Sequence, residues 1–374
     1  MTTPRYAWQP TTAAIAARLG IPERQVVRFD HNTSPFPTDW APGLVIEPAR
    51  TLNEYPGADY RPIREAAARY VEVAPENIVP AAGIDELILL TAQAFLEPGG
   101  SAATVIPTYP LYRIAALQRR AQLFEVPLLA PAFDYAMDPL LAAAAEADLL
   151  WLCVPNNPTG NRLTDGDLAQ LIFACPGVVV LDAAYAEIAG DRWGGWLERF
   201  NNLLVCHTLS KGFGLAGARI GFAAGDPRLI DALDGVRPPG SISTLSAGLA
   251  IAALDEPARM RRQVERLLRE RTRFAGALGG LGITVLPSEA NFLLCHIGPQ
   301  APAIADGLMS EGLVPRSFPT QGPLGGYLRF TVRSPEEDDL SLIHISEPKR
   351  LDLASSMPTS SLKGWGGGGG GGGG

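Results

Sequence analysis

The stretch Thr208-Leu-Ser-Lys-Gly-Phe-Gly-Leu-Ala-Gly217 follows directly on an apolar run, residues 203–206, which is typical of a buried strand. It places Lys211 after Ser210 and among glycines, which are too small to cover an amine. An uncovered amine at the end of a buried strand is a candidate nucleophile, because lysine amines form Schiff bases with carbonyl compounds. Arg219 follows closely, and with Ser210 it could hold a phosphate through its forked pair of donors.

Three interpretations of this stretch compete. The glycines at 212, 214 and 217 fit the G-x-G-x-x-G pattern of dinucleotide-binding folds, which requires a helix and then an acidic residue about 20 residues further on. Residues 219–224 instead favour another short strand, which leaves no room for that helix. A glycine-rich turn with a solvated lysine and a lysine that binds pyridoxal phosphate (PLP) both remain open on this stretch alone.

The length and composition are those of an ordinary globular enzyme. The 374 residues allow one large core or two domains, and 47% are apolar and 19% charged. A formal net charge of −8 argues against a nucleic-acid partner. No window approaches 18 uncharged apolar residues, so no membrane-spanning helix is expected. The N-terminus lacks the basic and apolar regions of a secretory signal, so we expect a cytoplasmic protein.

The cysteines and histidines show no spacing typical of a metal site or a disulfide framework. Each cysteine stands in an apolar run far from the others, as expected of a small buried hydrophobe in a reducing compartment. We therefore predict no metal site and no disulfide from Cys153, Cys175, Cys206, Cys295, His31, His207, His296 and His344.

Glycine and aromatic residues follow the first predicted strands. Residues 78–83 read as a strand and a glycine turn before a helix at 84–95, and free N–H groups at such a helix start suit a phosphate. An ordinary strand–turn–helix unit would have the same pattern. Tyr109 follows the strand at 101–107, where an aromatic cofactor ring would need a stacking surface.

Two further strands end in polar residues. The run 149–154 leads into Pro155-Asn-Asn-Pro-Thr-Gly160, which is too rich in turn formers to be helix or strand. The run 177–181 ends at Asp182, and a carboxylate there is costly unless it is paired; a helix-capping aspartate is the plainer alternative. Because every such element follows a strand, we expect a crevice at the carboxyl ends of a mostly parallel sheet, where open α/β folds bind ligands.

Taken in order, the glycine turn, Tyr109, Asn-Pro-Thr-Gly, Asp-x-x-Tyr, Ser-x-Lys and Arg219 resemble class I and II PLP-dependent aminotransferases, and most of all the histidinol-phosphate aminotransferase family. The resemblance runs from about Val26 to Asp339. It implies an α/β protein of PLP-dependent transferase fold type I (aspartate aminotransferase-like), with a mostly parallel sheet in a large domain and a smaller α+β domain. The boundaries that we expect are an N-terminal arm at 1–40, a large domain at 41–245, a small domain at 246–339 and a tail at 340–374.

The resemblance also implies a role for each site residue. Lys211 would bind PLP and move the substrate proton, Asp182 would pair with the ring nitrogen, and Asn157 and Tyr185 would bond the 3-oxygen. Tyr109 would stack on the ring. The phosphate ligands would be Gly83, Ile84, Asp85, Thr208, Ser210 and Arg219, joined by Tyr55 from the other subunit of a homodimer. The substrate ligands would be Asn32, Arg316 and Arg329.

The implied reaction moves an amino group from histidinol phosphate, or a related amino acid, to 2-oxoglutarate. A related decarboxylase acting on threonine phosphate, another aminotransferase of the same fold, and a protein that binds PLP without turnover remain alternatives. Asn32-Thr-Ser replaces the usual Asn-Glu-Asn of the family, which leaves the donor open.

The end of the chain departs from the family. Residues 341–348, Ser-Leu-Ile-His-Ile-Ser-Glu-Pro, resemble a translated sequencing adapter, and residues 366–374 are all glycine, a run with no packing role. We therefore expect residues 340–374 to be a non-native, disordered tail and the family's final amphipathic helix to be missing.

Overall fold

The computed structural model describes residue 6 and residues 9–346. Its larger sheet has seven strands in the order β2-β8-β7-β6-β5-β3-β4. Strands β4, β3, β5, β6 and β7 run parallel, whereas β8 is antiparallel to both β7 and β2. The mostly parallel sheet expected from the sequence is therefore confirmed. The strands are β2 (Ile78–Ala81), β3 (Ser101–Ile106), β4 (Gln122–Pro127), β5 (Leu149–Cys153), β6 (Val178–Asp182), β7 (Leu203–Thr208) and β8 (Gly221–Gly225).

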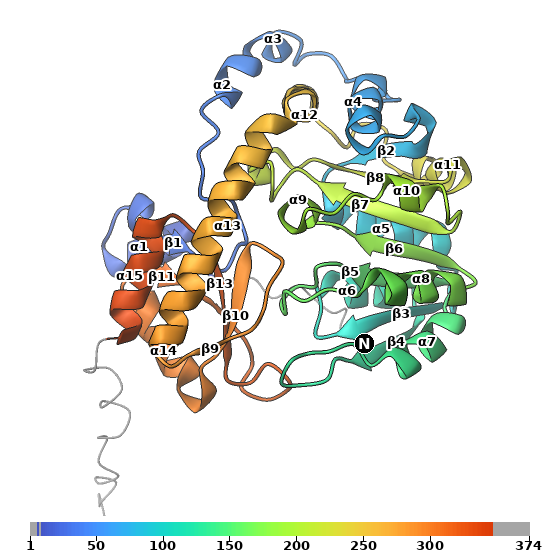
Figure 1. The fold of residues 1–374 in the computed structure, drawn as a ribbon. Helices are drawn as coiled ribbons and strands as arrows, with labels where there is room; N and C mark the ends of the chain where they lie inside the picture. Colours follow the sequence, from blue (N-terminus) through green and yellow to red (C-terminus); the bar gives the residue numbers. More distant parts are fainter. Residues whose placement is uncertain (1–5, 7–8, 347–374) are drawn as a thin grey trace, which may run out of the picture.

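Helices cover both faces of this sheet (Figure 1). Successive residues of β5 pack into two different hydrophobic cores. Trp151 packs in one core with residues of α5, and Leu152 packs in the other with residues of α8. A strand buried on both faces reads as a continuous apolar run, which explains why the sequence predicted these strands well. The helices are α4 (Arg61–Val71), α5 (Ile84–Phe95), α6 (Leu111–Gln118), α7 (Met137–Ala145), α8 (Asp165–Ala174), α9 (Ala186–Ala189), α10 (Gly194–Leu197) and α11 (Pro227–Val236).

The smaller domain is built on a four-stranded antiparallel sheet in the order β12-β13-β10-β9. Phe330 and Leu293 of this sheet share a core with Phe274 of α13 and Leu308 of α14. The elements are α12 (Thr244–Asp255), α13 (Pro257–Gly280), β9 (Thr284–Val285), β10 (Phe292–His296), α14 (Ala301–Ser310), β12 (Arg316–Ser317), β13 (Tyr327–Thr331) and α15 (Pro335–Ser346). Figure 1 shows α13 running from α12 down along the small domain toward α14.

The N-terminal segment packs on the small domain. Helix α1 (Thr12–Leu19) contributes Ile15 to a small core with Val314, and β1 (Val27–Arg28) pairs in parallel with β11 (Leu313–Val314). The remaining short helices are α2 (Ala41–Leu44), α3 (Ile46–Ala49), η1 (Glu23–Gln25), η2 (Pro75–Asn77), η3 (Ala216–Ala218) and η4 (Gly298–Gln300).

Helices α12 and α13 are separate, because Pro257 cannot continue a helix and instead begins α13. The structure differs from the sequence-based expectation at the end of the chain. The last helix is present: α15 continues past Asp339 to Ser346, and Ile345 is buried in the core. Ser341 and Ile345, four residues apart, face inward on the same side of the helix, which explains why residues 340–346 fold. Residues 347–374, the rest of the expected tail, lie outside the described residues.

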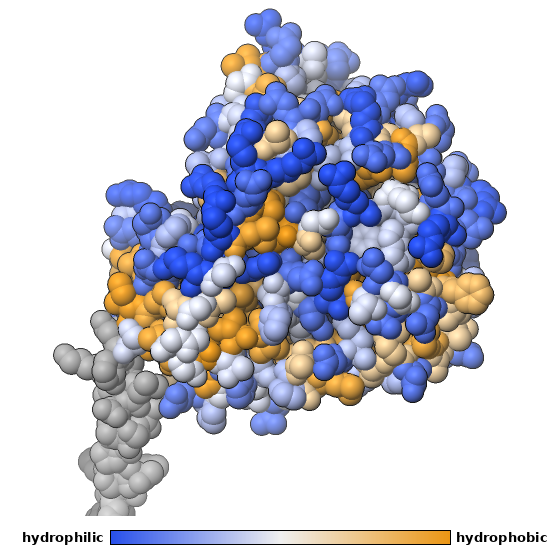
Figure 2. Space-filling view, viewed as in Figure 1, coloured by the Kyte–Doolittle hydropathy of each residue, from blue (hydrophilic) through white to orange (hydrophobic). Residues whose placement is uncertain are grey.

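Hydrophilic residues cover most of the face seen in Figure 2, and apolar residues gather where α13 meets the large domain and over the lower part of the small domain. None of the helices that the structure describes is both long and apolar enough to cross a membrane.

Candidate active site

A cavity of about 640 Å³ lies at the carboxyl ends of the parallel strands. Its walls come from the large domain, from the small domain and from the loop that follows β1. The site residues predicted from the sequence that line it are Asn32, Ile84, Asp85, Tyr109, Asn157, Asp182, Tyr185, Thr208, Ser210, Lys211, Arg219, Arg316 and Arg329.

Lys211 stands three residues beyond the end of β7. Its Nζ donates a hydrogen bond to the backbone carbonyl of His31 at 3.3 Å. Burial, and then the charge of Arg329, lower the pKa of Lys211 to about 8. A sizeable neutral fraction is therefore present near pH 8, and only the neutral amine is nucleophilic.

Asp182 is the last residue of β6, and only 2% of its surface is exposed. Its Oδ2 accepts from the Tyr112 hydroxyl at 2.6 Å, and its Oδ1 accepts from the backbone N–H of Ala184 at 3.0 Å. Burial raises the pKa of Asp182 to about 6, although both hydrogen bonds oppose this rise. Each oxygen keeps a second lone pair, so the carboxylate can still accept from a cationic ligand.

Asn157 and Arg329 join the two domains inside the cavity. Arg329 donates through Nη1 to the side-chain oxygen of Asn157 and through Nη2 to the backbone carbonyl of Asp30, at 2.7 Å for the latter. The side-chain oxygen of Asn157 is thereby occupied, which leaves its amide nitrogen as the donor. Burial lowers the pKa of Arg329 to about 10, and the side chain is 6% exposed rather than solvated.

Tyr185 and Asn32 form the adjacent wall. The Asn32 amide nitrogen donates to the Tyr185 hydroxyl at 3.0 Å, and Asn32 is itself held by the Thr331 hydroxyl. The Tyr185 ring meets Phe292 of the small domain edge to face. This network fixes the phenol oxygen at the cavity wall.

A cradle suited to a small anion lies where α5 begins. Gly83 has a φ of +88°, and a Cβ at this position would lie only 3.1 Å from Nη2 of Arg219. Glycine therefore lets the guanidinium approach the helix start, whose first N–H groups have no partner within the helix. Thr208 and Ser210 face the same space and are joined by a hydroxyl hydrogen bond of 2.9 Å.

Asp85 links two of the predicted ligands. Its carboxylate accepts from the Tyr109 hydroxyl at 2.8 Å and from Nη2 of Arg219 at 3.1 Å. The ring-stacking residue and the phosphate ligand expected from the sequence are therefore held by one side chain.

Tyr55, another predicted ligand, is not among the residues of this chain that line the cavity. It lies in the loop before α4, and 95% of its surface is exposed. The sequence did not predict the contact of Tyr112 with Asp182, although Tyr112 stands three residues after Tyr109, and it did not predict that His31 lines the cavity.

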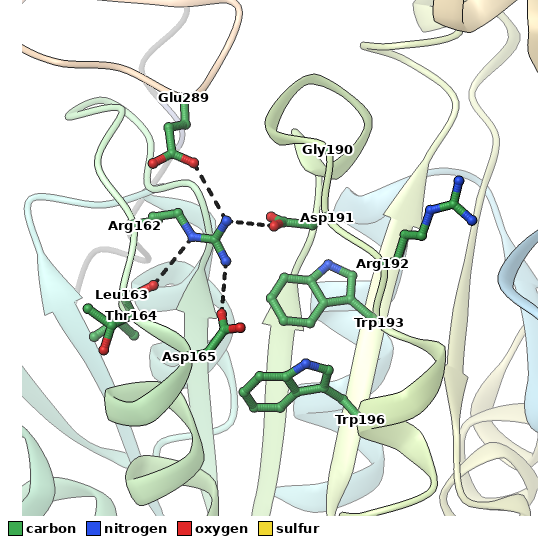
Figure 3. Close-up of a pocket in the computed structure, with 10 residues that line it drawn as sticks. All are labelled: Arg162, Leu163, Thr164, Asp165, Gly190, Asp191, Arg192, Trp193, Trp196 and Glu289. Atoms are coloured by element: carbon green, nitrogen blue, oxygen red, sulfur yellow. Dashed lines mark hydrogen bonds and ion pairs between the residues drawn. The ribbon is translucent and has the colours of Figure 1, made fainter.

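A second cavity, of about 550 Å³, lies apart from these residues and is shown in Figure 3. Arg162 stands at its centre, with Nη1 at 2.6 Å from Asp191 and 3.6 Å from Glu289 of the small domain. The indoles of Trp193 and Trp196 form the opposite wall. Three carboxylates surround Arg162, the third being Asp165, so its charge is already compensated.

Comparison with known proteins gives a consistent result. A profile of the family Aminotransferase class I and II matches residues 26–344. The chain is 36% identical to a histidinol-phosphate aminotransferase of Roseiflexus castenholzii over 89% of this chain and 92% of that protein. It is 36% identical to the Chromobacterium violaceum protein of that name, over 88% and 94% of the two chains. The crystal structure of histidinol-phosphate aminotransferase from Sinorhizobium meliloti in complex with pyridoxal-5'-phosphate superposes with a TM-score of 0.83 at 26% identity, covering 93% and 96% of the two chains.

Proposed function

The chain belongs to the class I and II aminotransferases, and we propose that it transfers the amino group of histidinol phosphate, or of a closely similar donor, to 2-oxoglutarate. As a member of this family it is a PLP-dependent transaminase that acts on small-molecule amino and keto acids. The observation that carries the substrate proposal is the pair Arg316 and Arg329, which lines the same cavity as Lys211 and suits an anionic group. Nε of Arg329 is buried and has no acceptor among the described residues.

The residues of the cavity fit PLP. The cofactor carries a carbonyl, a ring nitrogen that can be protonated, a phenolic oxygen and a phosphate. The chain offers an amine of lowered pKa in Lys211, a buried carboxylate in Asp182, donors at Asn157 and Tyr185, and the glycine cradle beside Arg219. Each chemical group of the cofactor therefore has a partner of matching character.

The proposed contacts follow this match. Asp182 would hold the ring nitrogen in its protonated form, and Tyr109 would stack on the ring. Asn157 and Tyr185 would bond the phenolic oxygen, while Ser210, Thr208, Arg219 and the start of α5 at Gly83, Ile84 and Asp85 would hold the phosphate. Bound PLP supplies an electron-withdrawing ring that stabilises negative charge on the carbon bearing the reacting nitrogen.

The chain's own residues then direct the proton transfer. Lys211 would hold the cofactor through its amine until the incoming amino group takes its place. The freed, neutral amine of Lys211 would then take the proton from the substrate α-carbon and hold it as an ammonium group, for return to the carbon on the other side of the reacting nitrogen. The low pKa of Lys211, caused by burial and by Arg329, keeps this amine available near neutral pH. Arg316 and Arg329 bind the anionic end of the substrate and set its distance from Lys211, which supplies the proximity on which the rate depends.

The proposal is tested by supplying PLP, histidinol phosphate and 2-oxoglutarate to the purified protein. Glutamate formation is the expected result. Parallel reactions with threonine phosphate, assayed for carbon dioxide, test the decarboxylase alternative, and a panel of amino acids with 2-oxoglutarate tests other donors. Carbon dioxide release without glutamate, or turnover of other donors only, would overturn the substrate proposal, and binding of PLP without any turnover would overturn catalysis itself.

We further propose that the active unit is a homodimer that works in the cytoplasm. Apolar side chains are exposed on the segment that carries Tyr55, namely Leu44, Ile46 and Leu52, as expected of a surface that a second subunit covers. The four cysteines are buried and free, which suits a reducing compartment.

A further inference from the structure

We propose that Tyr112 is a positioning residue for Asp182: its hydroxyl fixes the orientation of the carboxylate and keeps it ionised at the pH at which the enzyme works. This inference rests on the proposed role of Asp182 as the partner of the cofactor's ring nitrogen. It adds a residue that does not itself line the cavity.

The surroundings of Tyr112 allow one orientation of its ring. The residue lies in the first turn of α6 and is fully buried. Its ring stacks on Trp151 of β5, with centroids 6.0 Å apart and planes at 14°, and meets Tyr109 edge to face at 5.9 Å. The ring is clamped between a core tryptophan and the residue proposed to stack on the cofactor, so its hydroxyl is held in place.

The Tyr112 hydroxyl contacts the carboxylate of Asp182. It donates to Oδ2 of Asp182 at 2.6 Å, a distance typical of a hydroxyl bonded to an ionised carboxylate. The backbone N–H of Ala184 holds the other oxygen at 3.0 Å. Two donors from different elements thus set the plane of the carboxylate, and with it the direction in which its remaining lone pairs point.

The Tyr112 hydroxyl also affects the pKa of Asp182. Burial raises the pKa of Asp182 to about 6, and the hydrogen bond from Tyr112 is the largest effect opposing that rise. Tyr112 remains a donor throughout, because burial and the nearby carboxylate raise its own pKa well above the usual value. The other titratable groups that influence Asp182, or are influenced by it, are Lys211, Asp85, Cys153, Cys206, Tyr109 and Tyr185.

A purely structural role is the competing explanation, because a buried tyrosine hydroxyl needs an acceptor in any fold. The two explanations differ in what the loss of the hydroxyl changes. A structural hydroxyl affects stability alone. A positioning hydroxyl affects the protonation of Asp182, and hence the acid limb of the pH profile and the absorption of bound PLP.

The variant Tyr112→Phe removes only the hydroxyl. The acid limb of kcat/KM is expected to move to higher pH by about one unit, a shift typical of one hydrogen bond lost from a carboxylate. The pH titration of the visible absorption of bound PLP, recorded without substrate, is expected to move in the same direction. Tyr60→Phe is the matched control: Tyr60 is also buried and its hydroxyl also bonds, to the backbone of Ile242, but it does not contact Asp182. Its acid limb is expected to stay in place.

Asp182→Asn separates failure of this inference from failure of the proposed function. If Asp182→Asn leaves turnover and the absorption titration unchanged, the proposed role of Asp182 is wrong. The inference about Tyr112 is overturned if Asp182→Asn changes turnover and the absorption titration, whereas Tyr112→Phe has the same acid limb of kcat/KM and the same absorption titration as the wild type. The double variant is expected to match Asp182→Asn alone, because Tyr112 acts through that carboxylate. Any further loss of turnover in the double variant, after correction for the folded fraction by circular dichroism, contradicts the inference.

Discussion

Nη1 of Arg162 lies 2.6 Å from Oδ1 of Asp191, directly below the loop of the small domain that carries Glu289 (Figure 3). The side chain of Asp191 is 8% exposed and that of Arg162 is 24% exposed, so the pair is largely shielded from solvent. The same loop is tied to the large domain by the hydrogen bond from the Glu289 N–H to the Gly160 carbonyl, at 2.8 Å. Arg162 therefore secures the junction of the two domains beside the turn that carries Asn157.

The variant Arg162→Met is expected to lower the free energy of unfolding by about 2–3 kcal/mol. Removing one partner of a fully buried pair costs about 3–5 kcal/mol because the other charge is left buried, and partial exposure of Arg162 reduces this figure. Urea denaturation measures the change. The control Asp165→Asn breaks an ion pair whose carboxylate is 71% exposed, and it is expected to cost less than about 1 kcal/mol. Equal losses in the two variants would contradict a special role for the Arg162–Asp191 pair.

Lys211→Ala is expected to abolish the visible absorption of lysine-bound PLP, because Lys211 is the lysine that lines the cavity. In the wild type, the rate at which added PLP attaches to the cofactor-free protein should rise with pH through about 8 and then level off, since burial lowers the pKa of the amine to that value. Stopped-flow absorbance follows both effects. An unchanged band in Lys211→Ala would remove the lysine assignment, and a rate that climbs steadily to pH 10 would show an ordinary lysine pKa.

Asp182→Asn is expected to slow removal of the α-proton by about three orders of magnitude while PLP still binds. The amide cannot hold the ring nitrogen in its protonated form, so the ring withdraws electrons less strongly. Single-turnover kinetics with the amino donor measure the step, and fluorescence titration measures PLP affinity. Turnover within about tenfold of wild type, or about 1.4 kcal/mol in barrier height, would mean that Asp182 is not the partner of the ring nitrogen.

Local pattern was enough to predict the residues at strand ends. Asp182 and Lys211 each follow an apolar run that is buried on both faces of the sheet, and such continuous runs can be recognised in a sequence. Because the strands run parallel, the residues that follow them lie at the same edge of the sheet. Their meeting in one cavity required no knowledge of strand order beyond that rule.

The features that the sequence did not predict depend on long-range packing. Tyr112 and Asp182 meet only because β3 lies beside β5 and β5 beside β6, an order that no local pattern encodes. The contact between Arg162 and Glu289 depends on how the two domains sit together. The end of α15 was misjudged because the composition of residues 341–346 resembles an unrelated segment, whereas Ile345 is apolar at a position that faces the core.

Asp338 predicts a pH dependence of stability. Burial and the neighbouring Glu270 raise the pKa of this fully buried carboxyl well above its ordinary value of 3.8. The folded state therefore holds the proton more tightly than the unfolded state, so the contribution to stability is present below about pH 4 and is lost as the pH rises through the raised pKa of the folded state. Asp338→Asn, which stays neutral, should show a flatter dependence of the free energy of unfolding between pH 5 and 9. Chemical denaturation at several pH values measures this, and parallel curves for the two proteins would refute an elevated pKa.

Tyr55 is exposed to solvent and is not among the residues that line the cavity of its own chain. If Tyr55 reaches the phosphate in the other subunit of a homodimer, Tyr55→Phe removes a charge-assisted hydrogen bond worth about 1.5–3 kcal/mol, and PLP affinity should fall roughly tenfold to a hundredfold. Mixing Tyr55→Phe with Lys211→Ala under subunit-exchange conditions is the sharper test. In the mixed dimer one site carries both substitutions and the other carries neither, so one site in two should regain wild-type PLP affinity and turnover. Fluorescence titration and the transaminase assay measure the recovery, with unmixed samples as controls. A fully active monomer in analytical ultracentrifugation, or no recovery once exchange has been shown by mass spectrometry, would refute the shared site.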